Sequence, residues 1–117
     1  QFKQIVVAQN ATYDVPHIES TNYDEYYNMY EILKDDMASV EVAIEAYQEC
    51  GITPDIQPFR GETDGCIITY KGIPTPNLFT GAENLHGQYE FVTLESMQKA
   101  SDVVLKIIEL VQNKKVG

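Results

Sequence analysis

The sequence of 117 residues contains no tryptophan, only two histidines and two cysteines, and eight basic residues against 18 acidic ones. The resulting net charge of −10 argues against nucleic acid or an anionic membrane as a partner, because both require a basic surface. Cys50 and Cys66 form neither a Cys-x-x-Cys pair nor a zinc-finger spacing, so we expect reduced thiols. Apolar runs fall short of the roughly 18–20 residues of a membrane span, and no signal-peptide pattern follows Gln1. A cytoplasmic protein is therefore expected.

Apolar residues spaced three and four apart predict two helices. One follows the capping candidates Asp35 and Asp36 and ends at Gly51. The longer one begins after Thr93, which is suited to cap it. The first helix carries Met37, Val40, Ile44 and Tyr47 at this spacing, and the second has an expected core stripe of Met97, Ala100, Val104, Ile107 and Val111.

The remaining segments predict an α/β fold, with helices flanking a sheet. Residues 1–11 fit the end of a helix, 15–19 and 55–59 short strands, 20–31 a hinge and 73–79 an extended segment. Residues 60–72 are ambiguous, because Cys66–Tyr70 has strand propensity whereas Thr63 and Gly72 fit the ends of a helix. Ligands in such sheets collect where strands end, which here means Phe59–Gly61 and Phe79–Gly81.

Three motifs follow one another along the chain: Arg60-Gly-Glu-Thr-Asp-Gly65, Pro74-Thr-Pro-Asn77 and Asn84-Leu-His-Gly87. Together they resemble the C-terminal region of the co-catalytic zinc exopeptidases, the family that includes carboxypeptidase G and succinyl-diaminopimelate desuccinylase. Within that family the similarity is to the tripeptide aminopeptidases. It is strong over residues 54–100 and weaker from Tyr26 to the end of the chain.

The resemblance implies a two-domain enzyme in which a smaller α+β domain interrupts the catalytic α/β domain, covers the site and supports a homodimer. Residues 1–30 would be the end of this lid and dimerisation domain, with its helix, strand and return hinge. Residues 31–117 would be the C-terminal part of the catalytic domain. The family also places a short helix after Thr-Asp-Gly, so we expect a helix over 64–71.

The same resemblance assigns His86 as the family's final zinc ligand, a role that a neutral imidazole suits. Arg60 matches the arginine that grips the substrate's terminal carboxylate, which a guanidinium can hold bidentately. Asn84 is expected to contact substrate or to shape its loop. Without the resemblance, the flanking glycines favour a surface loop histidine at 86, and the acidic composition favours a surface ion pair at Arg60.

Other residues of the motifs are expected to be structural. Thr63 and Asp64 would cap a helix and brace the loop, and Glu90 would support the site without reacting. Glu62 stands where the family usually has a second glycine, and Leu85 replaces the usual phenylalanine. His17 is given no role.

A pair of catalytic zinc ions that share a bridging water needs about five protein ligands, and only His86 matches one. We therefore expect no catalytic residue here and an inactive chain, derived by truncation or proteolysis from a tripeptide aminopeptidase that holds two zinc ions per subunit. The apolar pattern at Phe2, which starts without a cap, is typical of an excised piece. The alternative is a complete non-catalytic module for peptide binding or association.

Overall fold

The computed structural model describes residues 1–59 and 61–116. Its regular structure is mostly helical, with one two-stranded sheet in the described residues. The elements follow in the order α1 (Phe2–Asn10), α2 (Tyr30–Leu33), α3 (Ala38–Glu49), α4 (Asp64–Tyr70), β1 (Ala82–Glu83), β2 (Phe91–Val92) and α5 (Leu94–Val116).

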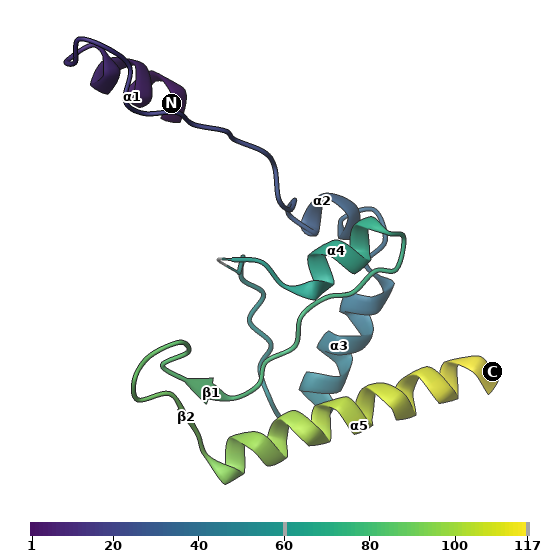
Figure 1. The fold of residues 1–117 in the computed structure, drawn as a ribbon. Helices are drawn as coiled ribbons and strands as arrows, with labels where there is room; N and C mark the ends of the chain where they lie inside the picture. The colour runs from purple at the N-terminus through teal and green to yellow at the C-terminus, as the bar shows by residue number, and fades with distance from the viewer. Residues whose placement is uncertain (60, 117) are drawn as a thin grey trace.

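The chain is extended rather than compact. Its radius of gyration is 20.7 Å and its longest dimension 71 Å, whereas a compact domain of this length has a radius of gyration of about 13 Å. Figure 1 shows α1 set apart from the other elements, which cluster around α3, with an extended segment joining the two parts. Buried hydrophobic side chains in the described residues are few: Leu33, Ala43, Ala46, Cys66 and Val103.

The α1 helix buries no side chain and ends in a turn tied by Asn10. The Asn10 amide oxygen accepts hydrogen bonds from the backbone N–H groups of His17 and Ile18, at 3.0 and 2.9 Å. The amide nitrogen of Asn10 donates to the carbonyl of Ile18 at 2.8 Å. Residues 11–18 therefore fold back onto the end of their own helix.

Neither predicted strand forms among the described residues. The backbone at 15–19 is not in a sheet because Asn10 satisfies the polar groups of His17 and Ile18. Residues 55–59 have no regular secondary structure, and the only strand pairing in the described part of the chain joins β1 to β2. A strand needs a neighbour to receive its backbone hydrogen bonds, so the expected sheet flanked by helices is reduced here to two short strands.

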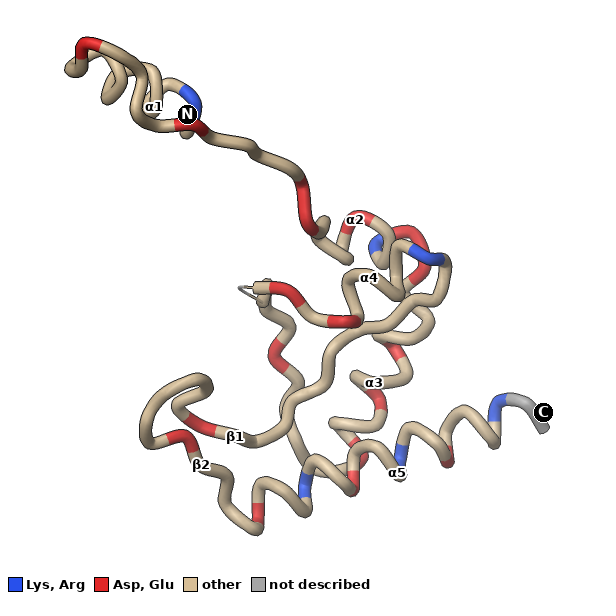
Figure 2. Tube along the Cα trace, in the orientation of Figure 1, with Lys and Arg blue, Asp and Glu red and all other residues tan. Residues whose placement is uncertain are grey.

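The largest packing contact joins α3 and α5, which cross each other in Figure 1. Ala46 on α3 and Val103 on α5 are both completely buried. Two ion pairs link the helices at the edge of this contact, Lys106 to Glu49 at 3.3 Å and Lys114 to Glu45 at 2.9 Å. Figure 2 shows acidic residues spread along most of the chain, including α3, and basic residues spaced along α5. Exposed pairs of this kind add little stability, typically below about 1 kcal/mol each.

The predicted core stripe of α5 is only partly right. Val103 is completely buried, whereas the predicted core residues Met97 and Val104 are 49% and 46% exposed. Ala100, Ile107 and Val111 of the predicted stripe are half-buried. The covered face of α5 therefore overlaps the expected one but includes Val103 in place of Met97 and Val104. As a result, α5 keeps a second apolar stripe exposed, formed by Leu94, Met97, Val104, Leu105 and Ile108.

The predicted C-terminal helix ends are confirmed, whereas Met37 rather than Asp35 or Asp36 occupies the N-cap position of α3. Gly51 follows α3 with φ +71° and the Ile52 N–H donates to the Tyr47 carbonyl at 2.9 Å. Gly72 follows α4 in the same way, with φ +97°. Only a glycine adopts these angles without strain. The expected helix after Thr63 is confirmed as α4, so the strand propensity of Cys66–Tyr70 is overridden.

Candidate functional site

The loop of residues 84–90 connects β1 to β2 and carries Asn84, His86 and Glu90. The two strands are antiparallel, with Ala82 opposite Val92 and Glu83 opposite Phe91. Strand pairing thus closes the loop at its base, immediately before α5 begins (Figure 1). The side chains of Asn84, His86 and Glu90 are exposed, so the loop presents its polar groups to solvent.

Two residues of this loop have a left-handed backbone. Asn84 has φ +55° and His86 has φ +62°, and they are the non-glycine residues with positive φ in the described part of the chain. Asparagine tolerates this conformation, but for most other residues it costs about 1–2 kcal/mol. Such a conformation persists only where neighbouring contacts impose it.

Hydrogen bonds within the loop supply those contacts. The His86 backbone N–H donates to the Glu90 carboxylate at 2.9 Å. The Gly87 N–H donates to the Asn84 carbonyl at 2.8 Å, and the Glu90 N–H to the Gly87 carbonyl at 3.2 Å. These three hydrogen bonds, all within the loop, hold its backbone in the observed conformation.

Two glycines bring the loop into close contact with its surroundings. A Cβ atom on Gly87 would lie 2.5 Å from the amide nitrogen of Asn84, so a larger residue would require the exposed Asn84 side chain to move. A Cβ atom on Gly81 would lie 2.6 Å from the Cβ of Ser96 in the first turn of α5, and Gly81 has φ +75°. The start of β1 is therefore held directly against α5.

The same turn of α5 is capped by Thr93, as the sequence predicts. The Thr93 hydroxyl accepts a hydrogen bond from the Ser96 N–H at 3.1 Å and donates to the Ser96 hydroxyl at 2.9 Å. Ser96 is thus contacted by Thr93 on one side and Gly81 on the other. These two contacts fix the position of the loop relative to the N-terminus of α5.

Among the residues expected from the first motif, Thr63 and Asp64 lie at the start of α4, and Arg60 lies outside the described residues. Thr63 occupies the N-cap position, where its hydroxyl lies 3.7 Å from the Cys66 sulfur. Asp64 is the first residue of the helix, where a negative charge interacts favourably with the helix dipole.

The segment 73–79 leads from α4 towards β1 and is held at both ends by side-chain hydroxyls that sequence reasoning missed. The completely buried Thr69 accepts a hydrogen bond from the Thr75 N–H at 3.0 Å. At the other end, the Phe79 N–H donates to the Tyr47 hydroxyl at 3.0 Å. The available signal was the polar side chain of Thr69, which directly follows the apolar residues Cys66, Ile67 and Ile68.

Metal-binding groups are sparse. No cluster of three or more histidine, cysteine, aspartate or glutamate side chains with metal-binding geometry occurs in residues 1–59 and 61–116. The exposed imidazole of His86 suits one position in a zinc site, and the nearest carboxylate in the loop, Glu90, is bonded to the His86 backbone. The described residues therefore fit one zinc ligand and do not form a site. His17 instead packs edge-on against Tyr13, at 4.9 Å between ring centroids.

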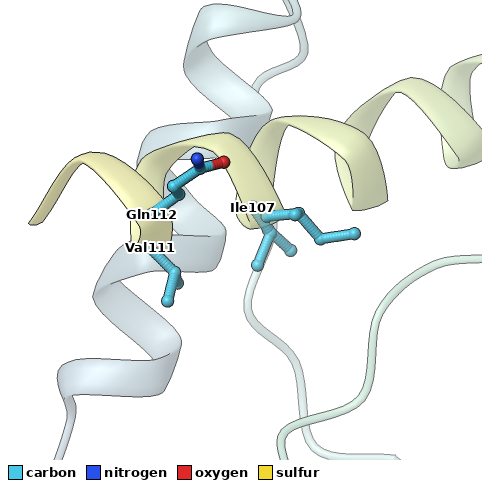
Figure 3. A pocket seen from close by; sticks show the side chains of 4 residues that line it. Ile107, Val111 and Gln112 are labelled. Carbon is cyan, nitrogen blue, oxygen red and sulfur yellow. The ribbon is translucent and has the colours of Figure 1, made fainter. Parts of the chain in front are cut away.

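A shallow hollow of about 410 Å³ on α5 offers no reactive chemistry. It is lined by Ile107, Ile108, Val111 and Gln112, all from this one helix. Figure 3 shows Ile107 and Val111 projecting from α5 where it crosses α3. No helix in the described part of the chain is both long and apolar enough to cross a membrane.

Comparison with known proteins supports the resemblance that the three motifs indicate. The sequence pattern of the peptidase family M20/M25/M40 matches residues 3–110. Peptidase T of Enterococcus faecalis is 49% identical over 110 residues, which is 94% of this chain and 27% of that protein. Peptidase T of Ligilactobacillus salivarius is 55% identical over 87 residues, covering 74% of this chain and 21% of the relative. Peptidase T of Fusobacterium nucleatum is 49% identical over 108 residues, covering 92% and 26%. The chain thus spans about a quarter of the length of these relatives.

Proposed function

The chain belongs to peptidase family M20/M25/M40, and on this basis we propose that it is the C-terminal part of a zinc-dependent tripeptide aminopeptidase. The complete enzyme would release the N-terminal residue of tripeptides. The observation that carries the proposal is the 49% identity to peptidase T of Enterococcus faecalis over 94% of the chain. The three motifs that indicate the family all lie within the matched residues 3–110.

The proposed domain organisation assigns residues 1–30 to the end of the lid and dimerisation domain and 31–117 to the catalytic domain. The separation of α1 from the elements around α3 supports this division (Figure 1). In the complete protein, residues 15–19 would pair with strands of the lid domain, and residues 55–59 with strands of the catalytic α/β domain. The exposed apolar stripe of α5 supports such additional packing, because large exposed apolar surfaces mark contact sites.

The proposed site combines a metal ligand with groups that hold the substrate. His86 would be a zinc ligand, Arg60 would bind the substrate's terminal carboxylate, and Asn84 would contact substrate or shape the loop. Bound zinc supplies an activated water for peptide hydrolysis. Arg60 would select for peptide length, because a peptide whose terminal carboxylate is bound to Arg60 places its scissile bond at the metal only if it is short.

The 117-residue chain alone is proposed to be inactive. A catalytic zinc needs about three protein ligands, and the described residues fit one. Thr63, Asp64 and Glu90 would hold the backbone of the site rather than react. We propose that the complete enzyme is a cytoplasmic homodimer with two zinc ions per subunit. The net charge of −10 argues against nucleic acid or a membrane as a partner.

The test compares His86→Ala with His17→Ala in the complete enzyme. We expect His86→Ala to lose zinc and tripeptide hydrolysis, whereas the His17→Ala control keeps both, because His17 packs on Tyr13. Arg60→Ala should mainly raise KM for tripeptides. Full activity of His86→Ala would contradict the metal assignment, and zinc-dependent turnover by the 117-residue chain would contradict the ligand count.

A further inference from the structure

The backbone of His86 is held in a conformation that a histidine rarely adopts. Its φ of +62° lies in the left-handed region, and its side chain is exposed, so packing of the imidazole does not impose this conformation. Some other contact has to keep the backbone there. The direction of the Cα–Cβ bond, and hence where the imidazole can reach, depends on that contact.

The Glu90 side chain makes this contact. Its carboxylate accepts the His86 backbone N–H at 2.9 Å, a hydrogen bond strengthened by the negative charge of the acceptor. Glu90 immediately precedes β2, whose pairing with β1 fixes the backbone on that side of the loop. The Glu90 carboxylate therefore extends across the loop from a backbone fixed by strand pairing and holds the backbone of His86.

We infer that Glu90 is a positioning residue that sets the direction of the His86 imidazole through the His86 backbone N–H. This inference rests on the proposed role of His86 as a ligand. Carboxylates near metal sites more often bond the ring nitrogen of a ligating histidine. The Glu90 bond uses the backbone instead and occupies neither ring nitrogen, so orientation and ligation are carried by different atoms of His86.

Three variants separate this role from a general effect of charge. Glu90→Ala removes both the acceptor and the charge, whereas Glu90→Gln removes the charge and keeps an acceptor oxygen. Glu83→Ala removes a charge from β1, whose pairing with Phe91 uses the backbone, and serves as the matched control. The chain has only two histidines, so labelling histidine with ¹⁵N gives two backbone amide signals, which a His17→Ala variant assigns.

In the 117-residue chain, we expect the His86 amide proton signal to move upfield in Glu90→Ala, to move less in Glu90→Gln, whose neutral acceptor gives a weaker bond, and to stay close to the wild-type position in Glu83→Ala. In the complete enzyme, zinc should be removed by a chelator about 10–100-fold more readily in Glu90→Ala, the range seen for groups that support metal ligands. The same variant should lose kcat more than it raises KM, and Glu90→Gln should restore most of both properties.

The outcomes distinguish this inference from the function on which it rests. If His86→Ala keeps zinc and activity, the proposed function fails and the positioning role fails with it. If His86→Ala is inactive while Glu90→Ala behaves as wild type, only the positioning role is overturned. If Glu90→Gln is as impaired as Glu90→Ala, the effect comes from charge and the hydrogen-bond argument is wrong.

Discussion

Val103→Ala and Val104→Ala form a matched pair that tests which face of α5 packs on α3. Both substitutions remove the same two methyl groups from adjacent positions, and both change helix propensity equally. Val103 is completely buried, whereas Val104 is 46% exposed. The sequence pattern alone predicts the opposite order, because Val104 belongs to the expected core stripe and Val103 does not.

The magnitude follows from burial. Removing two buried methyl groups costs about 1.6 kcal/mol of transfer free energy, and the cavity left at Val103 adds up to about 1 kcal/mol. The gain in helix propensity from valine to alanine returns about 0.6 kcal/mol, which leaves a net loss of roughly 1–2 kcal/mol. At Val104 about half of the transfer term remains and no cavity forms, so the net loss is about 0.3 kcal/mol.

The assay is urea unfolding of the 117-residue chain followed by circular dichroism at 222 nm. We expect Val103→Ala to lower the free energy of unfolding by about 0.7–1.7 kcal/mol more than Val104→Ala does, with similar slopes for both variants. Equal losses, or a larger loss for Val104→Ala, would refute the packing of α5 described above and restore the stripe expected from the sequence.

Three further outcomes are expected. Thr69→Val should lower the free energy of unfolding by about 1–3 kcal/mol, because the Thr75 N–H loses its acceptor; Thr69→Ser keeps a hydroxyl and should lose less. The exposed apolar stripe of α5 should make the chain associate, so light scattering should show a mass that rises with concentration, and a monomer at all concentrations would contradict this. Hydrogen bonds from Lys106 to Glu109 and Glu49 raise the Lys106 pKa above its ordinary value of 10.5. This stabilisation is present below that value and lost as pH rises through the raised pKa, so the urea midpoint should fall as the pH rises above 10.5 in wild type and should fall less in Lys106→Met.

The helix ends were the most predictable part of the fold, because they depend on local chemistry. The hydroxyl of Thr93 bonds the Ser96 N–H at the start of α5, and Gly51 supplies the left-handed residue after α3. Both signals lie within a few residues of the structure they specify. The α4 helix required more than propensity, since Cys66–Tyr70 alone favours a strand, and the family resemblance decided it.

Features that depend on distant contacts were not predictable from the sequence. The Asn10 side chain ties the backbone of His17 and Ile18, and periodicity carries no sign of such a bond. The burial of Val103 depends on where α3 crosses α5. In the candidate site, the resemblance predicts a metal ligand at His86 and a supporting role for Glu90, but their hydrogen bond and the left-handed backbone of His86 come from the loop geometry.

The separation of α1 has a consequence for the energetics of the whole chain. Because α1 buries no side chain and its turn is closed by its own Asn10, it adds nothing to the free energy of unfolding of the helices around α3. Cooperative melting of the chain is governed by α2 to α5, and a version trimmed of its first 18 residues should melt at the same temperature as the longer one.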